Sequence, residues 1–212
     1  MFRKDFLLQL YIMNQNFYYH ETAVLDDGCN VGEGSKIWHF SHLMAGSTIG
    51  KNCNIGQNVY VAATAVLGDG VKVQNNVSIY DGVVCKDNVF IGPSVVFTNV
   101  INPRAFISRK EEYKETIVEE GASIGANATI VCGNKIGKYA FVGAGSVVTH
   151  DVMDFELVAG VPAAHIGWVS KEGYRLEFNR YGIAFCHESK ETYTLKGGQV
   201  SILQKSDNND NK

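Results

Sequence analysis

The sequence lacks a run of apolar residues long enough to cross a membrane, since no stretch reaches the roughly 18 to 20 residues that a bilayer-spanning helix needs. It also lacks an excess of basic residues. The 19 lysines and arginines are outnumbered by 22 aspartates and glutamates, which gives a formal net charge of −3. Because domains that bind nucleic acid usually present a basic surface, the charge balance argues against such a partner.

Paired cysteines are missing too. The chain has five cysteines, an odd number, scattered without a C-x-x-C motif. A disulfide-stabilised secreted domain typically has an even, closely spaced set. We therefore expect free thiols and a cytoplasmic protein in which Cys29, Cys53 and Cys85 act as small buried apolar residues.

Helical periodicity is absent, and a period of six residues stands in its place. Apolar residues recur at every sixth position from Leu25 to Phe97: Leu25, Val31, Ile37, Leu43, Ile49, Ile55, Val61, Leu67, Val73, Ile79, Cys85, Ile91 and Phe97. A small or β-branched residue follows four positions after each, as at Ser35, Cys53 and Val71. This pattern is typical of a hexapeptide parallel β-helix, in which each hexad forms one short strand and one turn.

Three hexads close one triangular coil, and the repeat returns later in the chain at Val118, Ile124, Ile130, Ile136, Val142 and Val148. We therefore predict an all-β fold, a parallel β-helix of about six coils stacked about 4.8 Å apart. The distance from Phe97 to Val118 is not a multiple of six, which predicts an extended loop. The predicted organisation is an N-terminal extension at 1–17, a β-helix domain at 18–170 with a loop at 98–117, a small C-terminal extension at 171–205 and a disordered tail at 206–212.

The two ends of the chain carry further expectations. Arg3-Lys4 and the apolar stretch after them are not followed by a small-residue cleavage site, so a signal peptide is disfavoured. An amphipathic flap and a translation start placed upstream of a true start at Met13 both remain open. Alternation between Cys186 and Leu203 predicts a short hairpin around Lys196-Gly197-Gly198.

The hexads, with Val142-Gly143-Ala144-Gly145 and Gly160-Val161-Pro162-Ala163, resemble the left-handed β-helix acyltransferases, which use acetyl-CoA or related thioesters. A narrower resemblance is to the UDP-2-acetamido-3-amino-2,3-dideoxy-glucuronate N-acetyltransferases of bacterial O-antigen and lipopolysaccharide synthesis. It rests on Ile37-Trp38-His39-Phe40, Gly56-Gln57-Asn58-Val59, Lys72-Val73-Gln74-Asn75-Asn76, Tyr80-Asp81-Gly82-Val83 and Phe97-Thr98-Asn99-Val100. The resemblance implies a homotrimer with active sites between subunits, and no metal.

Polar residues one coil apart form columns that suit a sugar and its phosphates. His39, Gln57 and Asn75 form one column, Asn58 and Asn76 a second, and Asp81 and Asn99 a third. Turn positions favour Asn and Asp in any case, which is the competing explanation. The predicted substrate-binding residues are Gln57, Asn58, Gln74, Asn75, Asn76, Tyr80, Asp81 and Arg104.

The predicted reaction is acetyl transfer from acetyl-CoA to a sugar amine. An electron-poor amine with a pKa of about 8 is largely available as the neutral nucleophile near neutral pH, so a general base is not obligatory. The resemblance implies that Asn99 holds the amine. His39 is the alternative catalytic residue, as a general base.

For the coenzyme, the resemblance implies a path along the C-terminal coils. Small residues suit the lining for the pantetheine arm, and Lys138 and the Pro162 segment are candidates for the nucleotide end. The predicted coenzyme-binding residues are Ala126, Lys138, Gly143, Ala144, Gly145 and Pro162. Relatives often carry a basic residue where this chain has Ala164, which leaves the nucleotide contacts open.

Three other functions remain open on the sequence. The acceptor can instead be a dTDP-3-amino-3,6-dideoxyhexose, which lacks the uronate carboxylate that Arg104, Arg109 or Lys72 would pair with. A zinc carbonic anhydrase needs three convergent histidines, which this chain does not supply, because His39 and His42 lie within one coil and His150 lies about six coils away. A non-catalytic scaffold is the third alternative.

Overall fold

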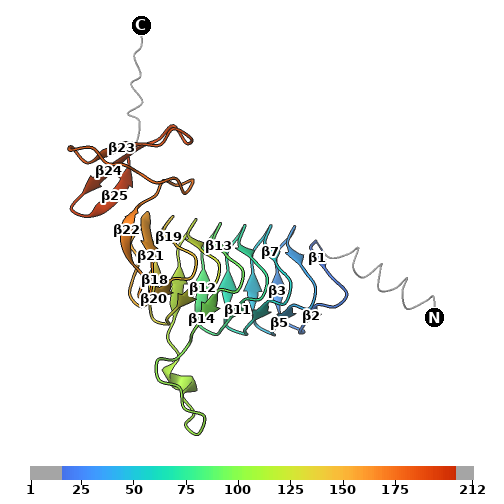
Figure 1. Ribbon diagram of the computed structural model, residues 1–212. Coiled ribbons are helices and arrows are strands. Elements are labelled where there is room, and N and C mark those ends of the chain that lie inside the picture. The colour runs from blue at the N-terminus through green and yellow to red at the C-terminus, as the bar shows by residue number, and fades with distance from the viewer. Residues whose placement is uncertain (1–15, 204–212) are drawn as a thin grey trace, which may run out of the picture.

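The computed structural model describes residues 16–203. The expectations about a flap or a start at Met13 and about a disordered tail at 206–212 lie outside the described residues. The described chain forms a long prism of stacked coils, a loop that projects from one edge, and a small sheet at the C-terminal end (Figure 1). No helix within residues 16–203 is long and apolar enough to cross a membrane.

Three parallel sheets form the faces of the prism, and each coil adds one short strand to each sheet. Sheet A contains β1 (Tyr18–Tyr19), β4 (Lys36–Ile37), β7 (Asn54–Ile55), β10 (Lys72–Val73), β13 (Phe90–Ile91), β16 (Ser123–Ile124), β19 (Phe141–Val142), β21 (Glu156–Ala159) and the antiparallel β22 (Ala164–Trp168). Sheet B contains β2 (Val24–Leu25), β5 (His42–Leu43), β8 (Tyr60–Val61), β11 (Ser78–Ile79), β14 (Val96–Phe97), β17 (Thr129–Ile130) and β20 (Val147–Val148). Sheet C contains β3 (Asn30–Val31), β6 (Thr48–Ile49), β9 (Val66–Leu67), β12 (Val83–Cys85), β15 (Thr116–Val118) and β18 (Lys135–Ile136).

Six strands in sheet C mean that six coils are complete, and β19 and β20 begin a seventh. Partner strands pair residues one coil apart, as Lys36 does with Asn54. The predicted all-β parallel β-helix of about six coils is therefore confirmed. We name the three edges of the prism by the sheets that they join: edge AB, edge BC and edge CA.

The core is the column of residues at the six-residue period. From Ile37 to Phe97 every predicted position is 2% exposed or less, and the returning positions Val118 to Val148 are fully buried. In the first coil, Leu25 and Val31 stay half-buried because no preceding coil covers them. Each buried aliphatic side chain contributes roughly 1.5 to 3 kcal/mol, so the stack is stabilised layer by layer.

The small residues of the second inward position take part in bonding between coils. The Ser35 hydroxyl donates to the Gly50 carbonyl at 2.8 Å and accepts from the Cys53 amide at 2.9 Å. Ser41 does the same one edge further on, with the Gly56 carbonyl and the Val59 amide. A buried hydroxyl costs free energy unless it is bonded, and these bonds remove that cost.

The predicted loop leaves the prism at edge BC, between β14 and β15, and contains one 3₁₀ turn, η1 (Lys110–Glu112). Beyond β22 the appendage forms an antiparallel sheet of β23 (Ile183–Phe185), β24 (Thr192–Lys196) and β25 (Gln199–Ile202). The hairpin predicted around Gly197-Gly198 is confirmed, since Lys196 pairs with Gln199 and both glycines have positive φ. This appendage has its own small core, built around Trp168, Leu176 and Tyr193.

Close packing between coils makes Gly125 sensitive to any added side chain. A Cβ at this residue would lie 2.5 Å from the Ala144 amide nitrogen of the next coil. We expect Gly125→Ala to lower the free energy of unfolding in urea by about 1 to 3 kcal/mol, because the backbone must move apart. Ser123→Ala, on the outer face of the same coil, should change it by less than about 0.5 kcal/mol; equal effects would contradict the explanation.

Candidate active site

Edge AB carries an aromatic group at its N-terminal end. The Trp38 indole N–H donates to Asn54 Oδ1 at 2.9 Å, which fixes the ring against the next coil. His39 stacks on His20 with 3.5 Å between ring centroids. A hollow of about 270 Å³ beside these rings is lined by Trp38, His39, Asn54, Gly56, Gln57, Gln74 and Asn75. The structure thus brings four predicted site residues together: His39, Gln57, Gln74 and Asn75.

Several of the predicted amides at edge AB also bond between coils. Asn75 Oδ1 accepts the Gln57 amide at 2.9 Å, and Asn58 Nδ2 donates to Asn76 Oδ1 at 3.0 Å. Asn58 and Asn76 have φ near 60°, a left-handed conformation that asparagine tolerates better than most residues. Turn geometry therefore explains why asparagine occupies positions 58 and 76. The Asn75 side-chain NH₂ is not used in these bonds and can donate to a ligand.

Edge BC holds the second group of predicted residues, at the neck of the loop. The Asn99 carbonyl accepts the Lys114 amide at 3.0 Å and the Thr98 hydroxyl accepts the Cys132 amide at 2.9 Å, so the neck is closed. The Asn99 side chain is partly exposed. Arg104 lies out on the loop, where its guanidinium donates to the neighbouring Pro103 carbonyl.

Asp81 and Tyr80 lie one coil before Asn99 on the same edge, since Ser78 pairs with Val96. Asp81 Oδ1 accepts both the amide and the hydroxyl of Thr64, at 3.1 and 2.9 Å, which gives this carboxylate a role in the turn. Tyr80 packs edge-on against Tyr60. Burial, followed by the charge of Asp81, raises the pKa of the Tyr60 phenol.

The two predicted catalytic residues do not meet within one chain. His39 follows β4 at edge AB, whereas Asn99 follows β14 at edge BC. In sheet B, β5 and β14 are separated by β8 and β11, a distance of roughly 14 Å along the prism. One chain therefore cannot bring both residues to a single reacting centre.

The predicted coenzyme residues separate into two places. Ala126, Gly143, Ala144 and Gly145 lie together on edge AB, where the Gly145 amide donates to the Ala126 carbonyl. The turn that contains Pro162 adjoins them through the Ala163 amide, which bonds the Val147 carbonyl. Lys138 lies across sheet A on edge CA, where its ammonium is 3.9 Å from Glu120 and its amide donates to Asp154.

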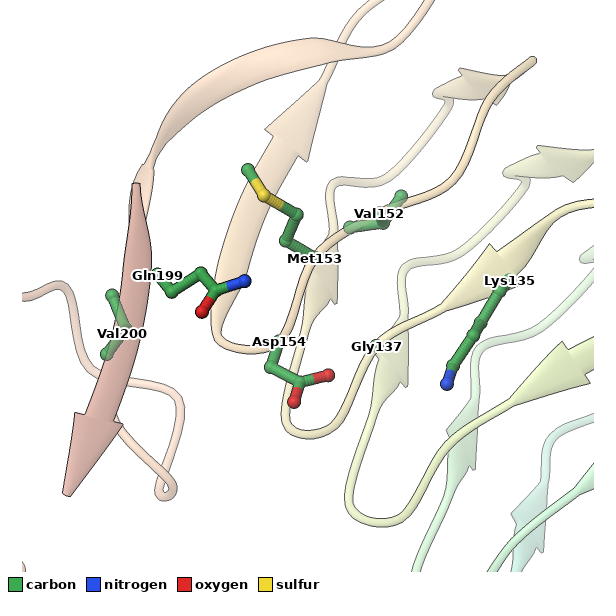
Figure 2. Close-up of a pocket in the computed structure, with 7 residues that line it drawn as sticks. All are labelled: Lys135, Gly137, Val152, Met153, Asp154, Gln199 and Val200. Atoms are coloured by element: carbon green, nitrogen blue, oxygen red, sulfur yellow. The ribbon is translucent and has the colours of Figure 1, made fainter. Parts of the chain in front are cut away.

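A cavity of about 340 Å³ lies between the last coils and the appendage, and none of the predicted site residues lines it (Figure 2). Its lining residues are Lys135, Gly137, Val152, Met153, Asp154, Gln199 and Val200. The Lys135 ammonium is held by Glu119 at 2.7 Å, and this partner raises the pKa of the lysine. Within residues 16–203 there is no group of three or more His, Cys, Asp or Glu side chains placed to hold a metal ion.

Asn54 lines the hollow and Lys36 lies next to it in sheet A, and the sequence interpretation named neither as a site residue. Both alternate with the inward column and point outward from sheet A beside Trp38. The 18-residue spacing of Lys36, Asn54 and Lys72 places these residues in one column, and this could have been read from the sequence. It could not identify them as binding residues, because outward residues that bind a ligand and outward residues that face solvent have the same spacing.

The chain is similar in sequence and fold to known proteins. The bacterial transferase hexapeptide family (six repeats) matches residues 28–63, and the hexapeptide repeat of succinyl-transferase matches residues 47–81 and 115–150. Over 165 residues the chain is 42% identical to dTDP-3-amino-3,6-dideoxy-alpha-D-galactopyranose 3-N-acetyltransferase of Aneurinibacillus thermoaerophilus, covering 78% of this chain and 85% of the relative. The chain belongs to the bacterial hexapeptide-repeat transferases. It is an acetyltransferase of that family.

A second curated relative and a solved structure are also similar to this hexapeptide-repeat acetyltransferase. Bifunctional protein GlmU of Thermodesulfovibrio yellowstonii is 32% identical over 166 residues, which cover 76% of this chain and 34% of that protein. The chain thus spans about a third of its length. A hexapeptide-repeat acetyltransferase of Vibrio cholerae, solved with acetyl-coenzyme A, aligns with a TM-score of 0.52 and 28% identity over 58% of this chain and 71% of that one.

Proposed function

We propose that the protein transfers the acetyl group of acetyl-CoA to the 3-amino group of a dTDP-linked 3-amino-3,6-dideoxyhexose. The observation that carries the proposal is the relative of that activity, 42% identical over 85% of its length. The uronate substrate favoured by the sequence motifs is not supported by that relative. Arg104, a candidate partner for the uronate carboxylate, lies exposed on the loop.

Acetyl-CoA and nucleotide sugars are cytoplasmic metabolites, so we propose that the protein acts in the cytoplasm.

The chemistry requires orientation more than proton removal. The neutral amine forms the new N–C bond with the thioester carbonyl, the C–S bond breaks, and the proton that the amine loses passes to the departing sulfur, which leaves as the coenzyme thiol. An amine with a pKa of about 8 is partly neutral at physiological pH. Asn99 is proposed to position the amine, and a backbone N–H of a neighbouring coil to stabilise the oxyanion.

A homotrimer with active sites between subunits is part of the proposal. Within the described strands, the outward residues of sheet B include no Lys, Arg, Asp or Glu: Val24, His42, Tyr60, Ser78, Val96, Thr129 and Val147. Depletion of charge is characteristic of the centre of an interface. Phe106 in the loop is 84% exposed, which suits contact with another subunit. Such contacts can bring edge BC of one subunit to edge AB of the next.

The small residues of edge AB are the proposed lining for the pantetheine arm. Ala126, Gly143 and Ala144 offer backbone groups without large side chains in the way. Lys138 is already close to Glu120 and lies on the other side of sheet A. We therefore propose that the coenzyme follows edge AB toward the Pro162 turn.

A thiol-release assay tests the function. Purified protein is incubated with acetyl-CoA and a panel of dTDP- and UDP-linked amino sugars, and free thiol is measured. We expect the highest kcat/KM with a dTDP-3-amino-3,6-dideoxyhexose and none with the N-acetylated sugar. A preference for the UDP-amino-uronate would replace the proposed substrate, and no release with any amine would favour a scaffold.

A further inference from the structure

The outer face of sheet A beside Trp38 is hollowed, and residues of three successive coils line the hollow. Trp38, Gly56 and Gln74 occupy the same place in three successive coils, since Lys36, Asn54 and Lys72 pair in register. A Cβ at Gly56 would lie 2.7 Å from Asn75 Oδ1 and 2.8 Å from the Gln74 carbonyl carbon, so glycine is needed there for the coils to pack closely, and the hollow lies on this face beside the indole. A hollow bounded by a fixed aromatic ring suits a flat heterocycle.

The polarity of two amides that line the hollow is fixed by their partners. Asn54 must turn its oxygen to the Trp38 indole N–H, which leaves its NH₂ as a donor. Asn75 must turn its oxygen to the Gln57 backbone N–H, which again leaves an NH₂ donor. Gln57 and Gln74 can turn either atom toward a ligand. Two fixed donors with an adjustable acceptor match the acceptor–donor–acceptor edge of thymine or uracil.

Cytosine and guanine match this pattern less well, because each presents an amino donor where thymine and uracil present a carbonyl oxygen. A fixed NH₂ donor would then face another donor. Leaving such groups unpaired is costly when they are desolvated. The hollow therefore favours a pyrimidine-2,4-dione.

Two lysines neighbour Asn54 on the same face. Lys36 and Lys72 lie on the strands either side of Asn54, and both are exposed. Neither forms an ion pair within residues 16–203. Two free ammonium groups beside a heterocycle site match a diphosphate.

We propose that this face of sheet A is the nucleoside diphosphate subsite, with the pyrimidine-2,4-dione against Trp38, its edge on the Asn54 and Asn75 amides, and Lys36 and Lys72 supplying the positive charge that attracts the diphosphate. The subsite rests on the proposed nucleotide-linked substrate. It sets the base preference of the enzyme and leaves the acetyl transfer to other residues.

Fluorescence titration with dTDP, UDP, CDP and GDP tests the subsite without any acetyl transfer. The chain has two tryptophans, so Trp168→Phe leaves Trp38 as the reporter. We expect dTDP and UDP to quench it, and to bind more tightly than CDP and GDP. In calorimetry, Trp38→Ala should weaken dTDP binding about 5- to 150-fold. Equal affinity for all four nucleotides, or unchanged affinity in Trp38→Ala, would overturn the proposal.

Separate substitutions test the Asn75 amide as a donor to the base and the two lysines as partners of the diphosphate. Asn75→Asp keeps the oxygen that accepts the Gln57 amide, as Asp69 does for the Lys51 amide on edge CA, but removes the donor. The ratio of UDP to CDP affinity should fall about tenfold, and the added charge cancels in this ratio. Lys36→Ala and Lys72→Ala should each weaken dTDP binding about tenfold, whereas Lys51→Ala should not.

These measurements separate the subsite from the function. If dTDP binds as expected but no amino sugar is acetylated, the subsite stands and the proposed function fails. If acetylation occurs and Trp38→Ala, Asn75→Asp and the two lysine variants bind dTDP like the wild type, the nucleotide lies elsewhere. An unchanged UDP to CDP ratio in Asn75→Asp contradicts the amide assignment.

Discussion

Replacing Asn99 by alanine is expected to lower kcat/KM for the amino sugar by roughly 10- to 1000-fold, a loss of about 1.4 to 4 kcal/mol of transition-state stabilisation. Asn99 lies at the closed neck of the loop, where the Lys114 amide donates to its carbonyl and the preceding residue, Thr98, accepts the Cys132 amide. A side chain on such a rigid neck can hold the amine in line with the thioester. Steady-state kinetics in the thiol-release assay measure the effect.

Asn102→Ala is the matched control, since Asn102 is an exposed asparagine of the same loop. It should leave kcat/KM within about twofold of wild type. If Asn102→Ala loses as much activity as Asn99→Ala, the loss comes from disturbing the loop. Unchanged activity in Asn99→Ala would remove this residue from the catalytic machinery.

The pH profile separates positioning by Asn99 from base catalysis by His39. If the amine arrives neutral, kcat/KM should rise with a single apparent pKa near 8 that belongs to the substrate. His39→Asn should cost less than Asn99→Ala and keep that pKa, because the His39 ring packs on His20. Loss of turnover together with loss of an enzyme pKa of about 6 to 7 would make His39 the general base.

Replacing Phe97 by alanine is expected to lower the free energy of unfolding by about 3 to 5 kcal/mol. Phe97 is 1% exposed and among the largest fully buried side chains of the core. It closes β14 immediately before the loop, so the cavity would lie under the neck that carries Asn99. Urea denaturation at a fixed protein concentration measures the change, because an oligomer adds a concentration-dependent contribution.

Val96→Ala is the comparison within the same strand, at an outward residue of the proposed subunit interface. Val96 points outward from sheet B and is 48% exposed. In an isolated chain its loss should cost less than about 0.5 kcal/mol. If Val96→Ala destabilises the protein as much as Phe97→Ala, and more at low protein concentration, Val96 is buried against another subunit, which is what the proposed trimer requires.

The six-residue period allowed the fold to be predicted because it constrains every coil in the same way. An inward apolar residue at each sixth position leaves one arrangement that buries all of them, and the structure buries them from Ile37 onward. The break between Phe97 and Val118 placed the loop for the same reason. Residues one coil apart share an edge, so the columns of His39 with Asn75 and of Asp81 with Asn99 could be assigned from sequence numbers.

The tertiary structure decided how each polar side chain in those columns is used. The side chains of Asn58 and Asp81 form hydrogen bonds between turns, whereas the Asn75 side chain keeps an NH₂ group that can donate. Lys138 lies away from the other predicted coenzyme residues. The period could not predict this, because turn geometry and ligand binding favour the same residue types. The hollow beside Trp38 depends on three coils at once, since its lining residues come from all three and the Asn54 bond fixes the indole. The sequence by itself determined the β-helix, its loop and the edge on which each residue lies, since these follow from burial along one column. Only the packing of one coil on the next decided which polar groups remain free to bind.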